Sequence, residues 1–202
     1  MVLLVKTEEK IMPNWCENGF KIEGPILKIK QIWETSNKGE NLLNALVPQP
    51  ENIFRGDLGA EERQRCKELG IPNWYDWGIV NWGTKWDIDF DQSSLEFNDN
   101  GDGTASIDGF FCTAWCPPLP CFETYASKNP DVRAEIQYRE SGVDYLGIAT
   151  FENGVLYDEY YGDIATKYRK GELPERIVND FGLDEWYEDY EWVDEDDEEE
   201  AA

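Results

Sequence analysis

The hydrophobic pattern of the sequence predicts strands and helices in an order that is compatible with few folds. Alternation of apolar and polar residues marks the strands, and apolar residues three or four positions apart mark the helices. The strand-like segments are residues 15–23, 95–97, 104–115, 132–140 and 145–151, and the helix-like segments are 25–37 and 117–127. This order predicts the α+β class: a split-βαβ antiparallel sheet with helices on one face and an additional strand.

A Trp-rich segment at about 41–86 lies between the first helix and the second strand, and the sheet does not require it. It contains a predicted helix over 59–69, and we expect it to be an insertion that packs over an edge of the core. Residues 1–11 are expected to be an N-terminal extension, followed by the domain at 12–155. The remainder, 156–202, is expected to be an acidic, aromatic C-terminal extension.

Charge restricts the possible partners. The chain has 43 Asp and Glu against 18 Lys and Arg, no His, and a net charge of −25. Bare nucleic acid and anionic membranes would repel it, so neither is an expected partner. The absence of His removes the usual neutral-pH general base and the commonest metal ligand, which favours a non-enzymatic function.

The five cysteines predict reduced thiols, because their number is odd and the chain is long enough to form a core. No secretory signal and no apolar run of membrane-spanning length occur, which favours the cytoplasm. Cys112, Cys116 and Cys121 lack the CxxC spacing of a zinc site. The Asp/Asn-rich turn at 98–108 resembles the start of a calcium loop, but Gly109 stands where a bidentate Glu is required. We therefore expect no metal and no cofactor.

Four motifs occur together: MPNWCEN at 12–18, WGTKWD at 82–87, FCTAWCPP at 111–118 and YRESG at 138–142. In this combination and order the chain resembles the YubB ferredoxin-like family, small proteins carried by bacteriophages and plasmids. The resemblance spans residues 12–150. It implies that the protein has a ferredoxin-like core and is encoded by a mobile element. The expected location is therefore the cytoplasm of a bacterial host cell. The resemblance implies no particular activity and no catalytic residue.

Acidic and aromatic residues alternate near the C-terminus, where residues 184–200 hold twelve acids and no base. In the cationic groove of a DNA-binding protein, aromatic side chains could pack as anchors, and acidic side chains could attract the groove over a distance. We therefore predict a non-enzymatic inhibitor that binds a basic nucleic-acid-binding host defence protein, such as a restriction or CRISPR effector, by mimicking nucleic acid. The expected binding residues are Asp184, Glu185, Trp186, Tyr187, Glu188, Asp189, Tyr190, Glu191, Trp192 and Asp194. The competing interpretation is a solubilising tail behind a helix that packs through Trp186 and Tyr190.

An alternative function, a small-ligand- or nucleotide-binding enzyme, uses the Trp-rich face. In this hypothesis Lys85 contacts a phosphate or carboxylate while indoles stack on the ligand. The candidate site residues are Trp82, Lys85, Trp86, Asp87, Thr113 and Trp115. In the competing interpretation Trp82 and Trp86 belong to the core, and Lys85 lies along an indole or pairs with an acid. The sequence leaves the oligomeric state open.

Overall fold

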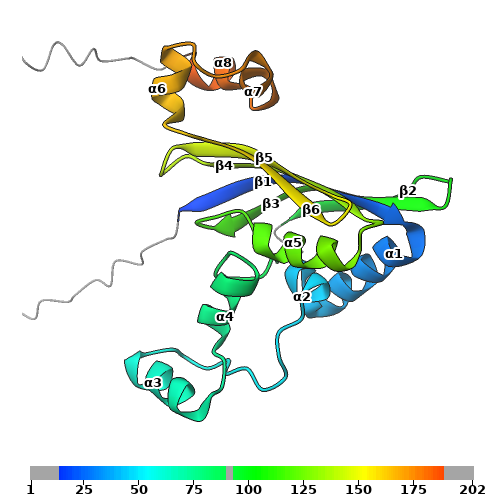
Figure 1. Cartoon of the computed structure of the whole chain (residues 1–202), viewed down its shortest axis with the longest axis vertical. Coiled ribbons are helices and arrows are strands. Elements are labelled where there is room, and N and C mark those ends of the chain that lie inside the picture. Colours follow the sequence, from blue (N-terminus) through cyan, green and yellow to red (C-terminus); the bar gives the residue numbers. More distant parts are fainter. Residues whose placement is uncertain (1–13, 90–92, 189–202) are drawn as a thin grey trace, which may run out of the picture. The chain divides into compact units, whose positions relative to one another are not determined.

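A computed structural model describes residues 14–89 and 93–188. It contains one six-stranded antiparallel sheet with the strand order β2-β3-β1-β4-β5-β6, which confirms the α+β class (Figure 1). The strands are β1 (Trp15–Pro25), β2 (Ser94–Asp99), β3 (Thr104–Ala114), β4 (Arg133–Glu140), β5 (Tyr145–Glu152) and β6 (Val155–Gly162). Strands β1 to β4 alternate with α1 and α5 in the expected order, and two further strands follow where one was expected.

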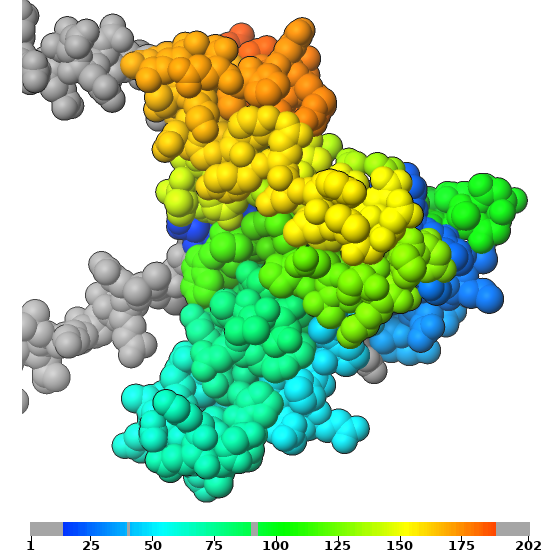
Figure 2. Space-filling view, viewed as in Figure 1, coloured from blue at the N-terminus to red at the C-terminus, as the bar shows by residue number. Residues whose placement is uncertain are grey.

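The helices form three groups along the chain. Helix α1 (Ile26–Thr35), with the π-helical turn η1 (Ser36–Glu40), and α5 (Leu119–Lys128) pack on the sheet. The insertion contains α2 (Leu42–Leu46), α3 (Ala60–Leu69) and α4 (Trp74–Asn81). Figure 2 shows the surface of α3 and α4, cyan to blue-green, projecting from the rest of the first unit. The last group is α6 (Ile164–Arg169), α7 (Glu175–Asp180) and α8 (Leu183–Tyr187). None of the helices in the described ranges has both the length and the apolar run needed to cross a bilayer.

The chain divides into two compact units, one ending at Gly162 and the other beginning at Asp163. The C-terminal extension expected from residue 156 therefore starts too early, because 156–162 belong to β6. The alternation of this strand is hard to recognise because none of its residues is buried. The exposed Asp158 pairs with Ala149 of β5 and accepts a hydrogen bond of 2.7 Å from the Tyr138 hydroxyl.

The alternation of β1 determines which of its residues face the core. Cys16, Asn18, Phe20 and Ile22 are buried, whereas Trp15 and Glu17 are exposed. The Phe20 ring contacts Phe111 of β3 and Phe122 of α5, with centroids 5.5 and 5.0 Å apart. Burial of such rings is the main favourable term for a domain of this size. The core thus lies between the sheet and the helices, and the residues of β1 that face away from it are available for a site.

Candidate functional site

Lys85 lies among three aromatic rings of its own chain. Its Nζ atom is 4.0 Å from the centroid of Trp86, 5.5 Å from that of Trp115 and 5.9 Å from that of Tyr75. Each distance is within the roughly 6 Å over which a cation is attracted to a ring face. The Arg63 guanidinium carbon lies 4.7 Å from the centroid of Tyr75. The ammonium of Lys85 therefore binds α4 to the end of β3 and is engaged inside the chain.

Trp82 belongs to the core. Only 4% of its surface is exposed. Its indole Nε1 donates a hydrogen bond of 2.9 Å to the carbonyl of Val47, which satisfies the one polar group that a buried indole carries. Trp82 is therefore a structural residue that joins the two ends of the insertion.

Asp87 caps the short helix α2. Its carboxylate accepts hydrogen bonds from the backbone N–H groups of Leu43, Asn44 and Ile88 at 2.7, 2.8 and 2.7 Å. These bonds favour the ionised form, but burial outweighs them and raises the pKa of Asp87 to about 6. Its two oxygen atoms are thus used for structure.

Two buried threonines hold the end of β3: Thr84 connects it with the WGTKWD segment, and Thr113 connects it with β1 and with the residues that follow β3. The Thr84 hydroxyl donates to the Ala114 carbonyl and accepts from the Ala114 N–H, both at 3.1 Å, much as a neighbouring strand would. The Thr113 hydroxyl donates to the Cys116 carbonyl at 2.8 Å and accepts from the Asn18 amide at 3.0 Å. Of the candidate ligand-site residues, Thr113 therefore has its hydroxyl engaged within the protein.

Trp115 follows β3 in a left-handed backbone conformation, with φ of 71°. Its N–H donates to the Asn14 carbonyl at 2.9 Å, and its carbonyl accepts from the Tyr145 hydroxyl at 2.6 Å. These two bonds hold an unusual conformation that turns the indole toward Lys85 and Tyr75.

A cavity of about 580 Å³, here called the β1–β3 groove, lies beside these residues. It is lined by Trp15, Glu17, Trp86, Asp87, Ile88, Asp89, Phe111, Cys112, Thr113 and Ala114. Trp86, Asp87 and Thr113 are candidate ligand-site residues, whereas Trp82, Lys85 and Trp115 do not line it. Trp15, Glu17 and Cys112 also line the groove but were not predicted to belong to a site. Their outward-facing positions on β1 and β3 are the signal that could have revealed them.

The β1–β3 groove is acidic and aromatic. The Trp15 and Trp86 rings lie 6.2 Å apart between centroids, and both are exposed. Three carboxyl groups line the cavity, and no lysine or arginine is among its lining residues. Glu17 pairs with Cys112 across β1 and β3, so the two side chains lie next to each other on one face of the sheet. The anionic ligand expected with Lys85 does not match this lining.

Three of the thiols, those of Cys16, Cys112 and Cys121, have raised pKa values that favour their protonated form. Burial raises the pKa of Cys16 to about 12 and that of Cys121 well above its usual value. Burial and the nearby Glu17 carboxylate also raise the pKa of Cys112. Because the thiolate is the nucleophile and the metal ligand, these three thiols are poorly suited to either task. Within the described ranges no group of three potential metal ligands is present.

The described part of the predicted partner-binding segment lies in α8 and the residue after it. Asp184, Glu185, Trp186 and Glu188 are exposed. Tyr187 is buried and stacks on Tyr168 with centroids 4.8 Å apart, so it packs inside its own unit instead of reaching a partner. Asp184 accepts a hydrogen bond of 2.7 Å from the Tyr168 hydroxyl. Asp189, Tyr190, Glu191, Trp192 and Asp194 lie outside the described residues.

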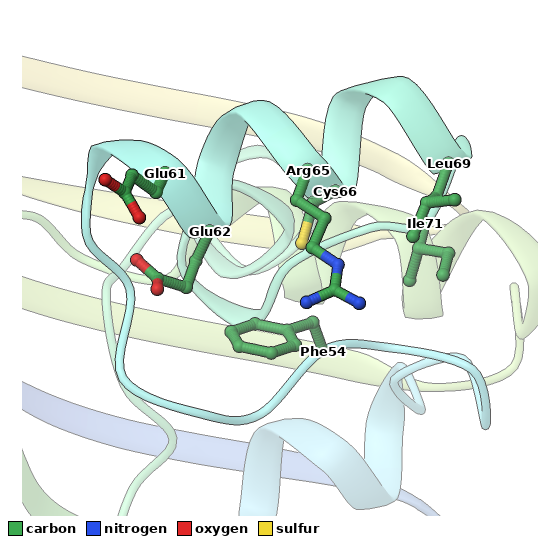
Figure 3. A pocket seen from close by; sticks show the side chains of 7 residues that line it. All are labelled: Phe54, Glu61, Glu62, Arg65, Cys66, Leu69 and Ile71. Atoms are coloured by element: carbon green, nitrogen blue, oxygen red, sulfur yellow. The ribbon is translucent and has the colours of Figure 1, made fainter.

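A second cavity, of about 440 Å³, lies within the insertion (Figure 3). Its lining residues are Phe54, Glu61, Glu62, Arg65, Cys66, Leu69 and Ile71. Figure 3 shows the Arg65 side chain extending from α3 toward the Phe54 ring. Glu62 accepts a hydrogen bond from the Gly59 N–H at 3.0 Å and so caps α3. None of the sequence-predicted site residues lies there.

Comparison with known proteins identifies relatives. A family model described as a ferredoxin-like domain in Api92-like protein matches residues 81–201. The curated "Uncharacterized protein YubB" of Escherichia coli (strain K12) is 26% identical over 117 residues, which cover 57% of this chain and 77% of that protein. The crystal structure of a protein api92 from Yersinia pseudotuberculosis aligns with a TM-score of 0.42 at 9% identity, over 75% of this chain and 99% of that one.

Proposed function

Because the chain belongs to the Api92-like family with its ferredoxin-like domain, and is a distant homologue of YubB, we propose a function that rests on its own charge and geometry. The names of these relatives state no activity. The protein acts as a non-enzymatic inhibitor: it binds a basic nucleic-acid-binding protein of the host defence, such as a restriction or CRISPR effector, in place of nucleic acid.

The observation that carries this proposal is an exposed indole set among exposed carboxylates. Trp186 is 53% exposed, and Glu185 and Glu188 beside it are exposed as well. They stand at the start of the stretch with twelve acids in the sequence. DNA carries one negative charge per roughly 1.7 Å of its axis, and the proteins that bind it present Lys and Arg to those charges. Closely spaced carboxylates can bind these Lys and Arg side chains in competition with DNA, and the exposed indole can pack against the partner protein.

The chemistry of the described side chains supports a binding function over a catalytic one. The chain has no His to act as a base. The Asp87 carboxylate caps a helix, and the pKa of the Cys112 thiol is raised. A site that turns over substrate at neutral pH needs a group whose pKa suits proton transfer or nucleophilic attack, and these groups are either engaged or unsuitable.

The test is competition with DNA. Purified restriction enzymes and CRISPR effector complexes are incubated with labelled target DNA while the full-length chain is titrated in. We expect the chain to displace DNA from at least one of them, and the inhibition to weaken as salt rises. No displacement from any member of the panel, or displacement that is indifferent to salt, would contradict the proposal.

A matched pair of variants locates the interaction. E185Q/W186A/E188Q removes the exposed indole and two charges of the C-terminal unit. E51Q/D57N removes two exposed charges of the insertion and serves as the control. We expect the first variant to inhibit at least tenfold less than the second. Equal inhibition would show that the loss depends on total charge and not on this segment.

The alternative function, a small-ligand- or nucleotide-binding enzyme on the Trp-rich face, is supported by two cavities. The β1–β3 groove is large enough for a ligand and contains two indoles, but carboxyl groups and not Lys85 line it, so a nucleotide there would meet charge of its own sign. A smaller cavity of about 340 Å³ is lined by four of the candidate residues, Trp82, Lys85, Trp86 and Asp87, together with Arg55. Calorimetric titration with ATP and GTP tests this alternative, for which we expect no binding.

A further inference from the structure

We infer that the β1–β3 groove binds an arginine side chain. This inference rests on the proposed function in so far as that arginine belongs to the basic protein partner. Three properties of the groove point to a guanidinium: its aromatic walls, its negative charge and its position along the part of β3 that β2 does not pair with in the described residues.

The aromatic walls are Trp15 and Trp86, which are 47% and 39% exposed. Large exposed indoles are uncommon unless they meet a ligand or partner, because burying them releases much ordered water. A guanidinium is planar and weakly hydrated and stacks on such rings more readily than a lysine ammonium does. The walls therefore favour arginine over lysine among cationic side chains.

The charge of the groove is set by Glu17. Its carboxylate is exposed on β1, directly across from Cys112 of β3. The raised pKa of the Cys112 thiol, partly caused by this carboxylate, is consistent with a negative potential there. No basic side chain is among the lining residues that would neutralise it. A carboxylate beside indoles supplies both the ion-pair partner and the stacking surface that a guanidinium uses.

The position of the groove leaves room for a side chain that enters from outside. In the described part of the chain, β2 pairs with β3 only as far as Phe110. Beyond that point Thr84 covers the backbone at Ala114, and the groove lies along the residues between. Its volume of about 580 Å³ accommodates an extended arginine with part of its backbone.

The same aromatic cluster already binds cations of its own chain. Lys85 lies 4.0 Å from the centroid of Trp86, and Arg63 lies 4.7 Å from that of Tyr75. Both side chains stand outside the β1–β3 groove. Internal cations thus lie over three aromatic rings, those of Tyr75, Trp86 and Trp115. Among the described residues no cation lies over the Trp15 ring, and the charged residues that line the groove with it are Glu17, Asp87 and Asp89.

Titration with a small probe tests the inference on the full-length chain. The probe is Nα-acetyl-arginine amide, and the neutral isostere Nα-acetyl-citrulline amide is its control. The indole N–H resonances are followed by ¹⁵N NMR and assigned with W15F and W86F. We expect the arginine probe to shift the Trp15 and Trp86 resonances in a saturable manner, and the citrulline probe to leave them in place.

Two variants complete the test. E17Q keeps the shape of the groove but removes its charge, and we expect it to weaken binding of the arginine probe at least threefold. E51Q, an exposed acid of the insertion, is expected to leave that binding unchanged. Absence of a saturable shift, equal shifts with citrulline, or an unaltered affinity in E17Q would each overturn the inference.

The outcome can be separated from that of the proposed function. If the probe binds but the chain displaces DNA from no effector, the arginine site stands and the inhibitor function fails. If the chain displaces DNA but the probe does not bind, the inhibitor function stands and this site fails. If both hold, E17Q is expected to reduce the displacement of DNA as well.

Discussion

The ammonium nitrogen of Lys85 lies 4.0 Å from the centre of the Trp86 ring, and two more rings lie within 6 Å of it. K85M removes the charge while keeping the length of the side chain. We expect it to lower the free energy of unfolding by about 1 kcal/mol, measured by urea denaturation, because the cation–π contacts are lost. K85R keeps a cation and should lose less. Equal stability of K85M and wild type would mean that Lys85 does not hold the insertion to β3.

The double hydrogen bond between Thr84 and Ala114 should contribute strongly to stability, because both partners are buried. T84V leaves the Ala114 N–H and carbonyl without that partner, and we expect a loss of about 1–3 kcal/mol in the free energy of unfolding. T84S retains the hydroxyl and should lose clearly less. A serine variant as unstable as the valine variant would show that the methyl group, not the hydroxyl, is important.

Gly147 of β5 is needed because another side chain occupies the place of a Cβ atom. A methyl group there would collide with the Tyr138 hydroxyl and come within 2.7 Å of the Glu159 carbonyl. G147A should therefore displace the hydroxyl from Asp158 and cost about 1–3 kcal/mol. In G19A the new methyl group meets its nearest atoms at an ordinary 3.8 Å. Thermal unfolding should rank G147A well below G19A, and the opposite ranking would contradict the assignment.

The pH dependence of stability should contain a contribution from Asp87. Burial raises its pKa from the ordinary value of 3.8 to about 6, so the folded chain holds this proton more tightly than the unfolded chain does. The resulting stabilisation is complete below about pH 4 and is lost as the pH rises through about 6, by about 2–3 kcal/mol in total. Urea denaturation of wild type and D87N from about pH 4 to 7 measures it as the change in their difference. A constant difference would contradict the raised pKa.

The reactivity of Cys112 should report on the charge of the β1–β3 groove. Its pKa is raised by burial and by the Glu17 carboxylate. E17Q removes the second cause, so at mildly alkaline pH a larger fraction of the thiol is ionised, and alkylation by iodoacetamide should become several-fold faster. E96Q changes an exposed acid on β2 and serves as the control. Mass spectrometry of the labelled peptide gives the rate, and equal rates in both variants would show that Glu17 is not a significant neighbour.

Sequence patterns predicted the elements whose inward positions are apolar. In β1 and β4 the buried residues alternate regularly, and both strands were found at nearly the expected bounds. Strand β6 was not recognised because all its residues are exposed or half-buried, so its sequence shows no apolar alternation. Alternation reveals a strand only where burial demands hydrophobicity.

The candidate ligand site was partly predicted for a related reason. The WGTKWD motif drew attention to Trp86 and Asp87, which do line the groove. Of the two interpretations of Lys85, the one in which it lies along an indole is confirmed by its contact with Trp86. No local pattern shows that Tyr75 and Trp115 lie beside it as well. The carboxylate of Glu17 comes from a strand almost seventy positions away from that motif, and only the pairing of β1 with β3 places it there.

The part of the insertion that follows α2 begins at Val47 and ends near Trp82, and one hydrogen bond of 2.9 Å joins these two residues. Asp87 makes a similar connection to Leu43 and Asn44. Because the two ends of this segment are held together, lengthening or replacing the residues between them costs little loop-closure entropy. The segment can therefore vary in length and sequence while the strands of the sheet keep their register.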